Sequence, residues 1–319
     1  MKVKFSMLHP DLQQHFKSRR FLSILVKVKW LTKLTNFFIN WLTAGRNIDE
    51  LNCEEVFIPS NDGSWKIRTR IYKPLVQDDP LPILVYFHGG GYILGNPEMS
   101  GEVIKRFIAT RPCVIIAPDY RKAYTKPYPA GFNDCYETLL WAARNTDRLH
   151  AKADKIIVAG HSAGGGLAAA VTLKARDTRE VKIVFQMPIY PMIDDTQPDD
   201  SSREIDAPIW NTDKNRIGWK AYLNDLYIDG TSIPSYAAPS RNKDYEDLPP
   251  TITFVGSLEP FFWETQKYAR CLRDAGVVVA YREFENCFHG FDGVPNAAIS
   301  KAARDFTFDS YAKFYDRYI

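Results

Sequence analysis

The chain has 319 residues, 45% of them hydrophobic, and a formal net charge of +3 at pH 7. This length and composition fit a soluble globular protein with one large α/β domain and insertions, rather than two equal domains. The most apolar stretch, Phe21 to Leu42, contains Lys27, Lys29 and Lys33, so a membrane-spanning helix is not expected. The start of the chain also lacks the apolar core of a secretory signal.

The cysteines argue against two kinds of site. They are odd in number, scattered and without a C-x-x-C pair, which disfavours both a disulfide framework and a zinc site. We therefore expect reduced thiols in a cytoplasmic protein that binds no metal. The five are Cys53, Cys113, Cys135, Cys271 and Cys287.

Charge is distributed unevenly along the chain. The first 46 residues form a basic arm, with nine Lys or Arg against one acid, Asp11, and a local charge of +8. Residues 191–247 hold twelve acids against six bases, a local charge of −6. Because this acidic segment offers the arm an internal partner, we expect the two to lie near each other over the functional site. Nucleic-acid binding is not expected.

The basic arm is also rich in large apolar residues interspersed with lysines. Two interpretations stay open: this part of the arm docks on a lipid surface, or it packs on the rest of the chain. Lys27, Lys29 and Lys33 do not fall on one helical face, which favours packing, so membrane contact is not expected. The apolar residues are Phe21, Leu22, Leu25, Trp30, Phe37, Phe38 and Trp41.

Beyond the arm, short apolar runs alternate with segments long enough for helices. Residues 54–59 and 65–71 predict an antiparallel pair, with a turn at 61–63. The later runs are typical of buried parallel strands joined by crossover helices. Those runs are 83–87, 114–117, 156–159, 183–185 and 252–255, with a last strand at 277–284, and the helices are 101–110, 131–144, 163–175, 263–275 and 299–317. The alternation predicts an α/β fold with an open, doubly wound, mostly parallel sheet. Active residues should gather at the carboxyl ends of its strands.

Residues 191–247 interrupt this alternation. No strand repeat fits there, and 215–223 have the pattern of an amphipathic helix. A long excursion that leaves the end of a strand is often a lid over a site.

Residues 160–166 read Gly-His-Ser-Ala-Gly-Gly-Gly, between the predicted strand 156–159 and the predicted helix 163–175. A serine flanked by glycines at such a corner stands clear of the backbone, at a helix N-terminus that favours negative charge. Ser162 is therefore the candidate nucleophile. The same pattern also describes an ordinary glycine-bounded turn, so a base, an acid and oxyanion donors must support it.

His289 and Glu259 are the candidate base and acid. His289 follows the last predicted strand and precedes a glycine, while Glu259 follows the strand at 252–255. The chain order is then serine, acid, histidine, as a site built on this kind of corner requires. Pro260 and the aromatic residues after it favour burial of Glu259. The alternative acids are Asp244, Asp247 and Glu264.

A glycine loop follows the strand at 83–87. Its backbone N–H groups can converge on one point because no side chain obstructs them, as oxyanion donors must. A flexible turn or a phosphate cradle would explain such a run, but neither predicts the second glycine cluster at 160–166. The candidate donors are Gly89, Gly90, Gly91 and Ala163, and the candidate substrate contacts are Tyr92, His161, Trp210 and Phe261.

Taken together, these motifs give a sequence that resembles the hormone-sensitive lipase family of esterases and lipases, within the α/β-hydrolase superfamily. The resemblance runs from about Ile83 to His289. The motifs that carry it are His88-Gly-Gly-Gly91, Asp119-Tyr-Arg121, Tyr128-Pro-Ala130, Gly160-His-Ser-Ala-Gly-Gly165, Tyr268-Ala with Leu272 and Ala275-Gly276, and His289-Gly-Phe291.

The resemblance implies roles for individual residues and for whole segments. Ser162, Glu259 and His289 would form a catalytic triad, and Asp119-Tyr-Arg121 a structural element. The likeliest oxyanion donors would be Gly90, Gly91 and Ala163. Residues 1–50 and 191–247 would build a helical cap on a catalytic domain of residues 51–190 and 248–319.

Three positions depart from the family pattern. Glu259 and His161 stand where the family usually or often has aspartate, and Lys122-Ala-Tyr-Thr125 replaces Leu-Ala-Pro-Glu. The longer Glu259 would require its loop to sit slightly further back. None of the departures removes a required reactive group.

We predict a serine carboxylesterase that cleaves short- to medium-chain esters through an acyl-enzyme and needs no cofactor. A deacetylase, lactonase or amidase would use the same residues, whereas a non-catalytic receptor on this scaffold would show a broken triad. Trp210, Trp219 and Tyr222 are expected to set the acyl-chain length. Besides a small-molecule ester, the other predicted partner is a second copy of the chain, paired through the last strand, 277–284.

Overall fold

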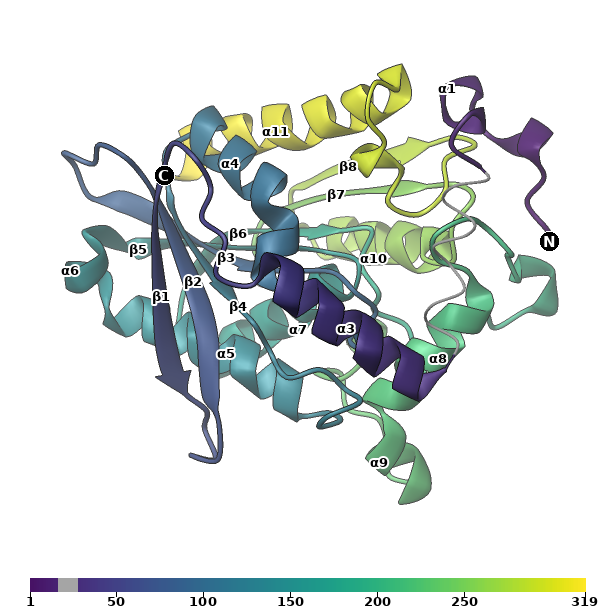
Figure 1. Cartoon of the computed structure of the whole chain (residues 1–319), viewed down its shortest axis with the longest axis horizontal. Helices are drawn as coiled ribbons and strands as arrows, with labels where there is room; N and C mark the ends of the chain where they lie inside the picture. The colour runs from purple at the N-terminus through teal and green to yellow at the C-terminus, as the bar shows by residue number, and fades with distance from the viewer. Residues whose placement is uncertain (17–27) are drawn as a thin grey trace.

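The computed structural model describes residues 1–16 and 28–319, with one eight-stranded sheet at the centre (Figure 1). The strands lie in the order β1-β2-β4-β3-β5-β6-β7-β8. β1, β2 and β4 pair antiparallel, and all other neighbours pair parallel. The strands are β1 Leu51–Pro59, β2 Lys66–Pro74, β3 Leu81–Phe87, β4 Val114–Pro118, β5 Ala151–His161, β6 Ile183–Ile189, β7 Thr251–Gly256 and β8 Val279–Phe284.

Helices cover both faces of this sheet. α5, α7 and α10 pack on one face, and α4 and α11 on the other, as Figure 1 shows. The helices are α1 Pro10–Gln13, α3 Lys29–Thr43, α4 Gly101–Thr110, α5 Ala130–Arg144, α6 Thr146–Leu149, α7 Ala163–Thr178, α8 Thr212–Tyr222, α9 Asn224–Ile228, α10 Phe262–Asp274 and α11 Ala298–Tyr318. Short 3-10 turns are η1 Phe5–Met7, η3 Pro97–Ser100, η4 Ser201–Arg203, η5 Pro239–Arg241 and η6 Phe291–Gly293.

The central strands read as continuous apolar runs because both of their faces are covered. β4 and β7 are buried along their whole length, whereas β1, at the edge, is mostly exposed or half-buried. The predicted α/β fold with a mostly parallel sheet is confirmed.

The predicted strands and helices after residue 50 are all present, and most boundaries differ by a few residues. The largest difference is at β5, which begins at Ala151 instead of Ile156. Ala151 pairs with Leu81 of β3 before an irregularity in the register. Residues 152–154 of the added part are exposed, and Lys152 and Asp154 among them are charged, so the apolar pattern could not reveal this part of the strand.

The start of the basic arm reaches the acidic segment. The Val3 N–H donates to the Asp206 carbonyl at 3.1 Å, and the Asp206 N–H donates to the Met1 carbonyl at 2.8 Å. The two segments therefore lie together here, as the charge distribution predicts, and main-chain hydrogen bonds make this contact.

α3 contradicts the expected packing of the arm. Trp30, Phe37, Phe38 and Trp41 are all exposed, so this prediction is wrong for the part of the arm that the structure describes. The side of α3 that meets the domain is polar instead. The remaining members of the predicted set, Phe21, Leu22 and Leu25, lie outside the described residues, as does Lys27. Within residues 1–16 and 28–319, no helix has both the length and the apolar character that crossing a bilayer requires.

Candidate active site

Ser162 occupies a sharp corner between β5 and α7. Its backbone has φ 59° and ψ −122°, which is strained for a residue with a side chain. Two hydrogen bonds of 3.0 Å hold the corner: the Ser162 N–H donates to the Ile189 carbonyl, and the Met192 N–H donates to the Ser162 carbonyl. The serine thus stands at the carboxyl end of a central strand, where its motif predicts it.

Glycine is required on both sides of this corner. A Cβ at Gly164 would lie 2.0 Å from the Phe87 carbonyl oxygen, and one at Gly160 would lie 2.2 Å from the Gly164 carbonyl oxygen. These neighbours are backbone atoms that cannot move aside cheaply. The close approach brings the corner against the end of β3, where the glycine loop begins.

A series of hydrogen bonds joins Ser162, His289 and Glu259. His289 Nε2 lies 2.9 Å from Ser162 Oγ, and His289 Nδ1 is hydrogen-bonded to Glu259 Oε2. Because a carboxylate can only accept, Nδ1 carries the proton, and Nε2 is left to accept one from the serine hydroxyl. The exposed fractions of the three residues are 7%, 6% and 2%, so water screens these interactions weakly.

The Glu259 carboxylate is also held by its own loop. Its Oε1 accepts a hydrogen bond from the Gly256 N–H at 2.8 Å. The Leu258 N–H donates to the Cys287 carbonyl at 2.9 Å, which ties the loop of the acid to the loop of His289. The glutamate side chain thus spans from the end of β7 to the imidazole.

Two aromatic rings flank the imidazole of His289. The Phe261 centroid lies 4.9 Å from it at 81°, and the Tyr190 centroid lies 4.8 Å from it at 76°. The Tyr190 hydroxyl donates to the Asp292 carboxylate at 3.0 Å. Phe261, a predicted substrate contact, is fully buried against the base. Sequence analysis misses Tyr190 and Asp292; the position of Tyr190 just after β6 was the available signal.

The glycine loop lies beside the serine. A Cβ at Gly89 would lie 3.5 Å from Ser162 Cβ. Gly90 and Gly91 have φ values of 127° and 61°, which glycine adopts readily. The described residues offer no hydrogen-bond acceptor to the N–H groups of Gly90, Gly91 and Ala163. These donors are therefore available to an oxygen bound next to Ser162.

His88 fixes the start of the glycine loop as a neutral imidazole. Burial lowers the pKa of His88 to about 3, so the ring is uncharged at neutral pH. Its Nδ1 lies 2.7 Å from the Gly89 carbonyl, which can only accept, so Nδ1 carries a proton and donates it. The ring stacks on Tyr120 at 4.3 Å, and the Tyr120 hydroxyl donates to the His88 carbonyl.

The segment 122–125, where the chain departs from the family pattern, supports the same loop. Lys122 Nζ donates to Asp119 Oδ1 at 2.8 Å. The Ala123 N–H donates to the Tyr92 carbonyl at 2.8 Å, just beyond the glycines. The substituted sequence is thus built into the structure around the glycine loop.

Tyr92 and Trp210, two predicted substrate contacts, pack the insertion on the glycine loop. A Cβ at Gly91 would lie 2.1 Å from Cη2 of Trp210. The Tyr92 ring stacks on Tyr222 of α8 at 4.0 Å, and its hydroxyl donates to the Met192 carbonyl at 2.7 Å. Both side chains are buried. Trp210 therefore lies next to the candidate oxyanion donors, whereas the Tyr92 hydroxyl is already engaged.

His161 turns to the other side of the corner. Its Nδ1 shares a hydrogen bond of 2.8 Å with the Tyr86 hydroxyl. Burial, and secondarily the neighbouring His289, lowers the pKa of His161 to about 3. His161 is hydrogen-bonded to Tyr86, whereas His289 Nε2 lies 2.9 Å from Ser162 Oγ, so His289 is the residue placed to act as base.

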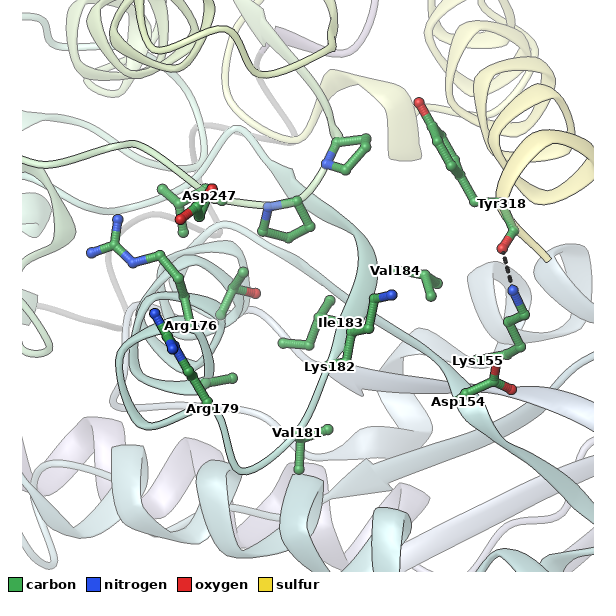
Figure 2. A pocket seen from close by; sticks show the side chains of 15 residues that line it. Asp154, Lys155, Arg176, Arg179, Val181, Lys182, Ile183, Val184, Asp247 and Tyr318 are labelled. Carbon is green, nitrogen blue, oxygen red and sulfur yellow. Dashed lines mark hydrogen bonds between the residues drawn. The ribbon is translucent and has the colours of Figure 1, made fainter.

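Two pockets lie at opposite ends of the strands. One, of about 660 Å³, is lined by His161, Val103 of α4 and Phe308 of α11. Figure 2 shows the other, of about 600 Å³, at the amino ends of β5 and β6, with Lys155 and Arg179 in its lining. The first pocket lies on the α4 and α11 side of the corner, to which His161 turns, and its lining does not include Ser162 or the glycine loop.

The alternative acids do not reach His289. Asp244 and Asp247 are exposed, and Asp247 lines the pocket of Figure 2. Glu264 is buried on α10, but its carboxylate faces the start of the insertion. Of the four candidates, the structure brings only Glu259 to the imidazole.

Glu264 is nevertheless an unusual group. Its Oε1 accepts hydrogen bonds from the Ile193 N–H at 2.7 Å and the Asp194 N–H at 3.3 Å, while Oε2 is buried without a hydrogen-bond partner in the described residues. Burial, and secondarily the charge of Asp194, raises the pKa of Glu264 well above its ordinary value of 4.5. The folded protein therefore favours the protonated acid.

Glu264→Gln is expected to raise the melting temperature by an amount that depends on pH. A carboxyl whose pKa is raised on folding stabilises the fold below the unfolded-state pKa and loses that contribution as pH rises through the folded-state pKa. Glutamine resembles the protonated acid, so the gain over the unmodified protein should grow from about pH 4.5 toward neutral pH. Calorimetry across this range measures it. A difference that stays constant with pH would contradict the assignment.

Within residues 1–16 and 28–319, no group of three or more His, Cys, Asp or Glu side chains is arranged to hold a metal ion. The five cysteines are free thiols.

Comparisons with known proteins identify the fold and the relatives of this chain. A family model for the alpha/beta hydrolase fold matches residues 84–293. Carboxylesterase NlhH of Mycobacterium tuberculosis is 34% identical over 247 residues, which cover 76% of each chain. Esterase LipI of the same organism is 32% identical over 245 residues, or 76% of this chain and 75% of its own. The solved structure of a bacterial heroin esterase superposes with a TM-score of 0.88 at 30% identity, over 98% of this chain and 99% of that chain.

Proposed function

Because the chain belongs to the hormone-sensitive lipase family of α/β hydrolases and is a carboxylesterase, we propose that it cleaves esters through an acyl-enzyme formed on Ser162. The observation that carries this proposal is the buried hydrogen-bonded series of Ser162, His289 and Glu259. It supplies a nucleophile, a base and an acid that orients the base.

The proposed reaction follows from where the protons lie in this hydrogen-bonded series. His289 Nε2 takes the hydroxyl proton as Ser162 Oγ attacks the ester carbonyl, and Glu259 stabilises the imidazolium that forms. The N–H groups of Gly90, Gly91 and Ala163 bind the oxyanion. The imidazolium then gives its proton to the departing alcohol oxygen. Water, activated by the same histidine, attacks the acyl-enzyme and releases the carboxylic acid.

We propose short- to medium-chain acyl esters as the substrate class. The buried Trp210 supports this class, because it closes the site on the side of Gly91, where a Cβ would lie 2.1 Å from its Cη2. Trp219 and Tyr222 are buried in aromatic contacts with Tyr92, so these cap residues are held in place by packing.

A panel of p-nitrophenyl esters of graded chain length tests this proposal. We expect kcat/KM to be highest for short and medium chains and to fall for long ones, with lactones and amides turned over poorly. An activated organophosphonate should block turnover by labelling one serine. A protein that the phosphonate does not label, or that cleaves amides better than esters, would contradict the proposal. The names of the similar proteins favour ester cleavage over the deacetylase, lactonase and amidase alternatives.

Three further parts of the proposal concern the surroundings of the site. Residues 1–50 and 191–247 act as a cap, supported by the pairing of Val3 with Asp206. A homodimer forms through β8, supported by its position at the edge of the sheet. The protein works in the cytoplasm, where its free thiols would stay reduced.

A further inference from the structure

α3 is an amphipathic helix whose polar side faces the protein. Asn36 Oδ1 accepts from the Gly95 N–H at 2.9 Å, and Asn96 Nδ2 donates to Asn40 Oδ1 at 2.9 Å and to Thr43 Oγ1 at 2.8 Å. These three helix residues, together with the fully buried Thr32, recur at the spacing of one helical face. The helix is therefore fixed to the domain by hydrogen bonds and not by an apolar stripe.

The opposite side of α3 is apolar and faces solvent. A helix of a globular protein normally turns such a stripe toward the core, so this arrangement is the reverse of the usual one. The helix has 15 residues, which makes the stripe roughly 20 Å long. Its members and their exposed fractions are Trp30 66%, Leu34 42%, Phe37 63%, Phe38 49%, Trp41 74% and Leu42 51%. Figure 1 shows α3 lying across the front of the molecule.

The charges around the stripe are basic. Lys29 and Lys33 are exposed on the same helix, which contains no Asp or Glu. Lys33 lies four residues before Phe37, at the edge of the stripe. Lys29 lies on the polar side of the helix, where it lines a groove of about 460 Å³ with Tyr124 and with Lys220 of α8 and adds to the positive charge there. A second copy of the chain would bring this surplus of positive charge against itself, whereas a surface of anionic headgroups would neutralise it. Tryptophan at both ends of an apolar stripe is typical of helices that lie in a membrane interface.

We propose that the outer face of α3, formed by the six apolar residues with Lys33 at its edge, docks on a lipid surface that carries anionic headgroups. The helix would lie in the plane of the interface, with its apolar stripe among the acyl chains and Lys33 at the phosphates.

Docking would also place the proposed active site at the lipid. The inner face of α3 is bonded to Gly95 and Asn96, which follow Gly89–Gly91 in the connection between β3 and α4. If the proposed esterase function holds, the site is then carried next to ester substrates that partition into the lipid. The docking itself does not depend on that function.

Co-sedimentation of the full chain with vesicles tests the proposal. The protein should pellet with vesicles of phosphatidylcholine mixed with phosphatidylglycerol, and much less with phosphatidylcholine alone. The double variant Trp30→Gln, Trp41→Gln should bind at least about 10-fold more weakly, because it lacks the two indoles that would be buried in the lipid. Lys33→Glu should weaken the preference for the anionic vesicles.

A matched control is Leu75→Gln with Val76→Gln, which changes two exposed apolar residues away from α3 and should leave vesicle binding unchanged. The proposal is overturned if the unmodified chain does not pellet, or if the control pair weakens binding as much as the tryptophan pair. It is also overturned if light scattering shows that the unmodified chain is a dimer and that the Trp30→Gln, Trp41→Gln variant is a monomer. A second copy of the chain would then cover this face. All variants should cleave a soluble p-nitrophenyl ester at the unmodified rate, so a failure of the esterase proposal would be seen separately.

Discussion

Replacing Ser162 with alanine is expected to lower kcat for a short-chain p-nitrophenyl ester by about 10⁴-fold or more. The variant keeps Cβ and the backbone bonds to Ile189 and Met192, and it loses only the oxygen that would attack the carbonyl. Folding should therefore be preserved, and KM should change much less than kcat. Steady-state kinetics together with a thermal melt measure both properties.

Ser60→Ala is a matched control for that experiment. Its hydroxyl is also buried and donates to Asp62 at 2.6 Å, but it lies in the turn between β1 and β2. We expect it to keep full turnover, even if it melts at a lower temperature. Substantial ester turnover by the Ser162→Ala protein, with the control behaving as described, would show that the nucleophile is another residue.

Glu259→Gln is expected to lower kcat by about 10⁴-fold, although the side chain keeps its shape. The Gly256 N–H needs an acceptor, so the amide oxygen of the glutamine should stay there and its NH₂ group should face His289. Nδ1 of the imidazole must then accept, which moves the proton to Nε2. With Nε2 protonated, the histidine cannot take the proton of Ser162. Kinetics across pH, with a thermal melt as the folding check, measure this effect.

Glu264→Gln makes the control for this change, because it neutralises another buried glutamate of the same region that does not contact His289. It should retain turnover. Glu259→Asp keeps the charge but shortens the side chain by one methylene, so it cannot span Gly256 and the imidazole together, and we expect an intermediate loss. If Glu259→Gln cleaved esters as the unmodified protein does, Glu259 would not be the acid of the site.

The parts of the site that sequence reasoning located are those marked by backbone constraints. Ser162 needs glycines at positions 160 and 164 because of contacts near 2 Å, and such a requirement leaves a pattern in the sequence. Glu259 and His289 were found from their places after predicted strands. The doubly wound order of strands and helices was predictable for the same reason, since buried parallel strands must be continuously apolar.

Other parts leave no local pattern. Tyr190 and Asp292 are single residues, 102 positions apart in the sequence. Tyr190 matters because its ring contacts His289 and its hydroxyl donates to Asp292. The unusual state of Glu264 depends on the backbone N–H groups at the start of the insertion, which donate to its carboxyl group. The orientation of α3 could not be read either, because periodicity shows that a helix has an apolar side and not which way that side faces.

The strained backbone at Ser162 bears on how this protein could change over evolutionary time. A positive φ at a residue with a side chain costs of order 1–3 kcal/mol, and glycine would relieve that cost at the same corner. Many stabilising substitutions leave the function unchanged and can be fixed by random drift. Ser162→Gly is different, because it removes the hydroxyl that the proposed chemistry needs. If selection on catalysis were relaxed, glycine at this corner would gain stability at no further cost, so the identity of residue 162 in a descendant lineage would record whether its catalytic role was still being maintained.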